Sequence, residues 1–78
     1  FGIYILLNRY KNPIYVGTST QLRHRLKAIL YGRSDYAQIK EKKELREEAY
    51  YYKRAYTSEA KGRKIEKRKK KGLKYNEL

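Results

Sequence analysis

The amino-acid sequence predicts an α+β domain with a small three-stranded antiparallel sheet flanked by helices, in the order β-β-α-α-β-α. Three observations lead to this prediction. Two β-rich runs at the N-terminus are separated by turn-forming residues, apolar residues then recur at helical spacing, and a tyrosine-rich run follows in the second half. A chain of 78 residues suffices for one domain with a small core, so residues 1–78 are interpreted as a single domain.

The first two strands are indicated by residues 1–7 and 14–17. Between them, residues 8–13 contain two asparagines and a proline, which are typical of a hairpin loop. A short loop of this kind joins neighbouring strands in antiparallel order.

The pairing of these strands decides which side chains meet. If Ile3 faces Val16, the constant sum of paired residue numbers in an antiparallel ladder places Tyr4 directly across from Tyr15. The two phenols are then neighbours on one face of the sheet.

A helix is predicted after the second strand. Residues 18–20, Thr-Ser-Thr, can cap it, and the apolar side chains that follow lie at i, i+4, i+7 and i+8: Leu22, Leu26, Ile29 and Leu30. At about 100° per residue, Arg25 borders this stripe, whereas His24 points nearly the opposite way. Arg25 is therefore expected to reach along the sheet edge towards the paired tyrosines.

Residues 34–48 predict a short and mostly solvated helix. Ser34-Asp35 is a plausible cap, and the apolar face is only partial, with Tyr36, Ile39 and Leu45. Residues 49–56 are rich in β-formers and lack Gly and Pro, so they predict the third strand.

The last predicted helix begins after Ser58, which can serve as its N-cap, and it ends before Gly72. Its only hydrophobic side chains are Ala60 and Ile65. Gly62 weakens such a helix by about 1 kcal/mol relative to alanine.

Ten tyrosines and one phenylalanine make up the aromatic residues. We expect most of them, and Tyr50 to Tyr52 in particular, to fill the small core while their hydroxyls reach water or a partner. Tyr10, Tyr31 and Tyr36 are the candidates for stacking on unpaired bases.

The charge of the chain points to a polyanionic partner. Twenty-one Lys and Arg against eight Asp and Glu give a net charge of +13, and nucleic acid is the usual partner of so basic a domain. The absence of cysteine excludes disulfides and thiolate zinc sites. No apolar run is long enough for a membrane span or a signal peptide, so we expect an intracellular protein that does not insert into membranes. Since the sequence contains no methionine, we also expect it to begin downstream of a natural start.

Gly2-Ile3-Tyr4, ten intervening residues, Tyr15-Val16-Gly17 and Arg25 ten positions after the second tyrosine form a spaced motif. It resembles the GIY-YIG nuclease superfamily, which includes homing, repair and structure-specific endonucleases. The resemblance covers nearly the whole chain and is strongest up to Arg25. It implies a metal-dependent DNA endonuclease domain.

The chemistry implied by the resemblance uses one Mg²⁺ or Mn²⁺ ion that binds the scissile phosphate and the leaving oxygen. Arg25 would neutralise charge on the phosphoryl oxygens through its planar guanidinium. Tyr4 or Tyr15 would take the proton from the attacking water, and the sequence leaves open which of them does so. Asn76, which follows a tyrosine near the C-terminus, matches the asparagine that buttresses the site in the family.

The metal ligand is less directly indicated. The family places a glutamate on the last helix about a dozen residues before the closing asparagine, and this count falls on Lys64, which cannot ligate a cation. Glu66 is the nearest carboxylate and our predicted ligand, with Glu59 as the other candidate. A second departure is Ile29, four residues after Arg25, where several relatives have His or Tyr.

DNA is the expected partner, in branched or flapped form or with help from a recognition domain outside this chain. The predicted contacts are Gly17, whose lack of a side chain lets a ligand approach the backbone, and the basic residues Lys67, Lys69, Lys70 and Lys71. The main alternative is a basic nucleic-acid-binding module without catalysis, such as a degenerate nuclease domain. Attachment to acidic membranes is a weaker alternative, because the basic run has no accompanying apolar helix face.

Overall fold

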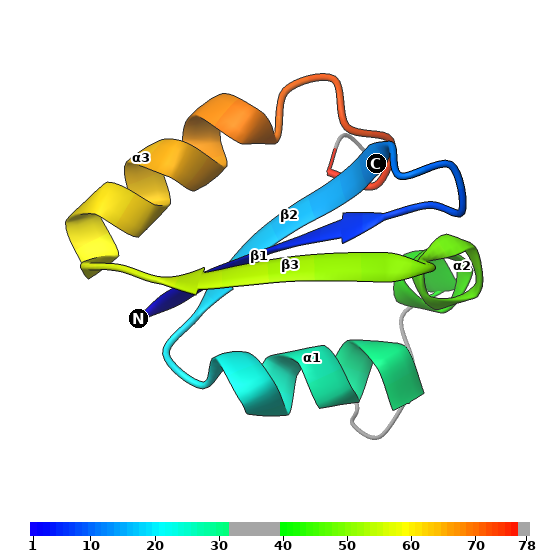
Figure 1. The fold of residues 1–78 in the computed structure, drawn as a ribbon, viewed down its shortest axis with the longest axis horizontal. Coiled ribbons are helices and arrows are strands. Elements are labelled where there is room, and N and C mark those ends of the chain that lie inside the picture. The colour runs from blue at the N-terminus through cyan, green and yellow to red at the C-terminus, as the bar shows by residue number, and fades with distance from the viewer. Residues whose placement is uncertain (32–39, 77–78) are drawn as a thin grey trace.

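The computed structural model describes residues 1–31 and 40–76. Their elements are β1 (Gly2–Leu7), β2 (Pro13–Ser19), α1 (Leu22–Tyr31), α2 (Lys40–Glu48), β3 (Tyr51–Tyr56) and α3 (Glu59–Lys69). The strands form one antiparallel sheet in the order β2-β1-β3, with α1 on one side of it and α3 on the other (Figure 1). The predicted fold class and element order are confirmed.

The register of β1 and β2 differs from the predicted one. Tyr4 lies opposite Gly17, and Tyr15 lies opposite Leu6, so the strands are displaced by two residues from the predicted pairing. Because side chains alternate between faces with a period of two, this displacement leaves both tyrosines on the same face.

The hairpin loop and a register shift between Leu6 and Leu7 together explain the displacement. Asn8 donates its N–H to the carbonyl of Asn12 and accepts from Lys11 N–H, and its side chain accepts from the N–H groups of Tyr10 and Asn12. Lys11 adopts a positive φ of 64°, which closes the turn within three residues. β2 therefore begins at Pro13, earlier than the sequence indicates.

The core lies between α1 and the sheet. The apolar stripe of α1 is buried as predicted, and it belongs to a cluster with side chains from both N-terminal strands and from the second half of the chain: Tyr4, Leu6, Ile14, Leu22, Leu26, Ile29, Leu45 and Tyr75. Gly2 lets α1 approach closely, because a Cβ atom there would lie 2.7 Å from a methyl carbon of Leu22.

α2 is described from Lys40 to Glu48. The predicted cap Ser34-Asp35, together with Tyr36 and Ile39, lies outside the described residues. Leu45 is fully buried, so it fixes this otherwise charged helix to the core.

The prediction that Tyr50 to Tyr52 fill the core is wrong. Every residue of β3 is exposed, and Tyr50, Tyr51 and Tyr52 keep 66%, 41% and 50% of their surface. β3 is an edge strand, and the leucines and isoleucines of α1 and β1 already fill the space between helix and sheet. The tyrosines of β3 are therefore left at the surface.

α3 begins as predicted, with the Ser58 hydroxyl accepting from Lys61 N–H. Gly72, at φ 79°, takes the left-handed conformation just beyond its end. Gly62 is more than a weak point in the helix, because a Cβ atom there would lie 2.8 Å from the Phe1 ring. The lack of a Cβ atom at Gly62 lets α3 pack closely on the start of β1.

Candidate active site

Tyr4 and Tyr15 lie side by side on the sheet face that α1 covers. Their ring centroids are 6.1 Å apart with an interplanar angle of 38°. Tyr4 is 1% exposed, whereas Tyr15 is half-buried at the border of the core. The structure thus brings together the two tyrosines that the motif singled out.

Gly17 has a packing role that the sequence did not indicate. It is buried opposite Tyr4, and a Cβ atom on Gly17 would overlap with the Tyr4 hydroxyl and ring. The space on this face of Gly17 is therefore filled by Tyr4, and the contact of Gly17 with DNA stays a prediction. The glycine fits the Tyr4 phenol against β2.

Arg25 and His24 differ in burial as the helical phase predicts. Arg25 is half-buried beside the apolar stripe of α1, whereas His24 is exposed. A half-buried guanidinium is partly shielded from water, which strengthens its interaction with an anion.

Glu66 faces the sheet. Its side chain is half-buried, and its Oε1 accepts a hydrogen bond from the Thr18 hydroxyl at 3.2 Å. The competing candidate, Glu59, instead forms an exposed ion pair with Arg63, with its Oε1 3.1 Å from Nη2. The geometry therefore favours Glu66 over Glu59 as a ligand.

The basic side chains next to Glu66 are more exposed than Glu66 itself. Lys67, Lys69, Lys70 and Lys71 are all exposed, and so is Lys64 on the preceding turn. α3 thus separates a carboxylate directed to the sheet from a cationic outer surface.

Asn76 holds the outer edge of β2. Its side chain accepts from Val16 N–H at 2.9 Å and donates to the Val16 carbonyl at 2.9 Å. The adjacent Tyr75 N–H donates to the Ile14 carbonyl. The C-terminal segment therefore covers the free backbone edge of the strand that carries Tyr15.

A polar cluster ties the same segment to α2. Glu48 accepts from Lys74 Nζ at 2.8 Å and from the Tyr75 hydroxyl at 3.1 Å. The hydrogen bond from Lys74 lowers the pKa of Glu48, and the same bond raises the pKa of Lys74. Burial raises the pKa of the Tyr75 phenol.

β2 relates these parts to one another. Tyr15 and Thr18 lie on opposite faces of the strand, so the tyrosine pair is on the α1 side and Glu66 on the α3 side. β2 is an edge strand, and Asn76 lies against its outer edge between these two faces. Thr18 was missed at the sequence level, although strand alternation already places it on the other face from Tyr15.

The site offers a divalent cation one carboxylate ligand, that of Glu66. In residues 1–31 and 40–76 no three His, Asp or Glu side chains gather into a metal-binding cluster. Glu66 with the Thr18 hydroxyl offers a single carboxylate, which suits Mg²⁺ because this ion keeps most of its water ligands.

Among the described helices, none is long and apolar enough to cross a membrane.

No protein-family model matches the chain, and no curated protein matches it in sequence. Several solved structures, by contrast, are similar to the chain in fold. The GIY-YIG N-terminal endonuclease domain of UvrC from Thermotoga maritima, bound to its catalytic magnesium, is 26% identical, with a TM-score of 0.72 over 95% of this chain and 80% of that one.

Point mutants of the same domain are equally similar. One in which a tyrosine is replaced by phenylalanine is 27% identical, with a TM-score of 0.75 over 95% of this chain and 79% of that chain. One in which an asparagine is replaced by alanine is 26% identical, with a TM-score of 0.72 over the same shares. Both mutants are bound to the catalytic divalent cation. The similarity therefore extends well beyond the first twenty-five residues.

Proposed function

Because the chain belongs to the GIY-YIG nuclease superfamily, we propose that it is the catalytic domain of a divalent-metal-dependent DNA endonuclease. The observation that carries the proposal is the arrangement around β2. The tyrosine pair and Arg25 lie on one side of this strand, and a sheet-facing carboxylate lies on the other. The similar magnesium-bound domain supports the same activity for this chain.

Glu66 would hold one Mg²⁺ or Mn²⁺ ion, for which a single protein carboxylate suffices because such an ion keeps most of its water ligands. The bound ion supplies Lewis-acid stabilisation of the charge that develops on the phosphate and the leaving oxygen. Thr18 fixes the carboxylate through its hydroxyl, in the way that hydrogen bonds around a ligand commonly orient it.

Tyr15, in its phenolate form, takes the proton from the attacking water and becomes the neutral phenol, and Tyr4 positions that water. This division follows from burial, since a general base must reach a water molecule, and Tyr15 is half-buried whereas Tyr4 is 1% exposed. The contact between the two rings and the fit of Tyr4 against Gly17 hold the pair in place.

Arg25 neutralises the charge on the non-bridging phosphate oxygens, with a planar fork that can contact two oxygens at once. Asn76 fixes the backbone of β2 at Val16, next to Tyr15 and Gly17. The exposed lysines of the α3 end, Lys67, Lys69, Lys70 and Lys71, contact the DNA backbone.

The test is cleavage of DNA by the purified chain with Mg²⁺, with Mn²⁺ or with a chelator. Supercoiled plasmid and labelled linear, flapped and branched oligonucleotides are the substrates. We expect nicking or cleavage that depends on the divalent ion. Binding of these DNAs without cleavage under any metal condition would overturn the proposal in favour of a non-catalytic binding module.

A further inference from the structure

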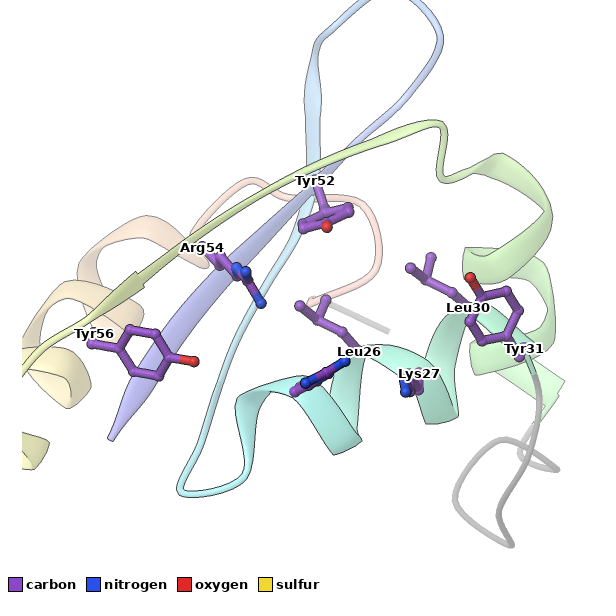
Figure 2. A pocket seen from close by; sticks show the side chains of 8 residues that line it. Leu26, Lys27, Leu30, Tyr31, Tyr52, Arg54 and Tyr56 are labelled. Carbon is purple, nitrogen blue, oxygen red and sulfur yellow. The ribbon is translucent and has the colours of Figure 1, made fainter.

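A groove of about 520 Å³ lies between α1 and β3, apart from the residues assigned to the active site. Figure 2 shows Tyr52, Arg54 and Tyr56 projecting from β3 towards α1, with Leu26 and Leu30 on the helix below them. We call it the α1–β3 groove. Its volume is within the range of small-ligand sites.

The groove is on the other flank of α1 from Arg25. Arg23 and Lys27 line it, and each is two positions from Arg25, which is about 160° around the helix. The buried stripe of α1 separates the two flanks. A molecule in the groove would therefore leave the proposed catalytic face of α1 accessible.

Cations and aromatic rings alternate in this groove. Arg23, Lys27 and Arg54 supply three positive charges, and none of the described side chains that line it is acidic. Tyr52 and Tyr56 flank Arg54 on the same face of β3, about 7 Å on either side. Tyr56 keeps 71% of its surface exposed and Tyr52 keeps 50%.

The groove adjoins a second hollow along α1. A second hollow of about 570 Å³, next to the start of the helix, shares Arg23, Lys27 and Tyr56 with it. An extended groove with Tyr56 at its middle suits a segment of a polymer better than a compact small molecule.

Another surface hollow with exposed tyrosines differs in charge. Tyr10 and Tyr50 lie beside Arg9, Glu47 and Glu48, so the described lining of that hollow has no excess of positive charge. Exposed tyrosines are thus combined with an excess of positive charge in the α1–β3 groove but not there.

We propose that the α1–β3 groove binds unpaired single-stranded DNA. Bases stack on Tyr52 and Tyr56, while Arg23, Lys27 and Arg54 contact the backbone phosphates, the combination by which proteins hold single strands without reading their sequence. The proposal rests on the proposed endonuclease function and deepens it. The substrate is DNA that has an unpaired segment beside the duplex to be cleaved.

The test measures the affinity of the chain for a fluorescent twelve-nucleotide oligo(dT), and for a duplex of equal length, by fluorescence anisotropy. A chelator in the buffer removes divalent ions. We expect Tyr56→Ala to weaken oligo(dT) binding at least fivefold, since a stacked base contributes about 1–3 kcal/mol, while Tyr56→Phe retains binding. Arg54→Ala should weaken it as well and lower the slope of log affinity against log salt by about one.

Matched controls separate the groove from general charge. Lys53→Ala removes the same charge from the opposite face of β3, and Tyr50→Ala removes a similarly exposed ring beside acidic residues. Both should change oligo(dT) affinity less than twofold. Because β3 is exposed, none of these variants removes a core side chain, and circular dichroism verifies the fold.

The proposal would be overturned if Arg54→Ala and Lys53→Ala lowered oligo(dT) affinity equally. It would also be overturned if Tyr56→Ala lowered the affinity for the duplex as much as the affinity for the single strand. The assay contains no divalent ion. A failure of the proposed endonuclease function would appear separately, as absent cleavage with intact, groove-dependent oligo(dT) binding.

Discussion

The two edges of the sheet differ in how much of the molecule covers them. The β2 edge is closed by the C-terminal segment, since Asn76 occupies both backbone groups of Val16 and Tyr75 N–H donates to Ile14. The β3 edge is exposed along all of its residues. One sheet thus has a rigid edge and an open one.

This difference matches the demands of two tasks. Catalytic groups must be held within a fraction of an ångström, which needs packing and fixed backbone around them. A surface that captures a flexible strand needs accessible rings and charges instead. We infer that β2 serves the chemistry and β3 serves the substrate, and the following predictions test this assignment from the largest effect to the smallest.

The largest effect is expected from Glu66→Gln, on the α3 side of β2. It removes the proposed metal ligand while leaving an acceptor for the Thr18 hydroxyl, so metal-dependent cleavage should fall by about 10³ or more. DNA affinity should stay the same or rise slightly, because one negative charge is lost. Initial cleavage rates in Mg²⁺ measure the effect.

Glu59→Gln is the matched control, since it removes a carboxylate of the same helix that is already paired with Arg63 at the surface. It should cleave at nearly the wild-type rate. The opposite ranking of these two variants would move the ligand to Glu59.

A smaller but still large effect is expected from Arg25→Ala. Loss of a group that neutralises transition-state charge typically costs about 10²–10³ in rate. Arg25→Lys should remain poor, because the two-pronged contact is lost. His24→Ala, which changes an exposed neighbour, should retain cleavage of duplex DNA. Single-turnover cleavage rates measure these effects. An equal fall in rate for Arg25→Ala and His24→Ala would refute the assigned role of Arg25.

Gly17→Ala tests how tightly the β2 side is packed. The new methyl group would overlap with the buried Tyr4 phenol, so the free energy of unfolding should drop by about 1–3 kcal/mol. Ala55→Thr on exposed β3 should change it by less than about 0.5 kcal/mol. Urea unfolding compares the two, and similar values for both would remove the contrast between the edges.

Asn76→Ala tests the closure of the β2 edge itself. It leaves the N–H and carbonyl of Val16 without their partner, which should cost about 1–2 kcal/mol of unfolding free energy. Asn76→Asp keeps the acceptor and loses the donor, so its stability should be intermediate. The cleavage rate should fall in the same order as the free energy of unfolding. Unchanged stability in both variants would show that the C-terminal segment is dispensable.

The smallest effect concerns pH. The lowered pKa of Glu48 means that its stabilising contribution is present above the ordinary glutamate value of 4.5 and is lost as the pH falls through the lowered value. The raised pKa values of Lys74 and Tyr75 act at the other end, where stability is lost as the pH rises above about 10. Glu48→Gln should flatten the acid limb of urea midpoint against pH, whereas Glu47→Gln should leave it unchanged.

The sequence predicted most of the fold because the relevant signals are local. The α1 stripe and the Ser58 cap depend only on residues within a turn or two of each other. Tyr4 and Tyr15 share a face even though the predicted register was wrong, because alternation survives a displacement of two residues.

The remaining features depend on contacts between distant segments. The turn at Asn8 and the register shift between Leu6 and Leu7 set the pairing of β1 and β2, and the packing of α1 left the tyrosines of β3 exposed. Gly62 became a packing requirement only because Phe1 lies against it.

The amino-acid sequence by itself determined the motif, the order of elements and the sides on which Tyr4, Tyr15 and Arg25 lie, because periodicity along a strand or helix encodes them. Only the tertiary structure decided that Glu66 faces the sheet while Glu59 faces solvent, and that one sheet edge is closed and the other open. These choices depend on partners up to sixty residues away, as for Asn76 and Val16, and no local pattern carries that information.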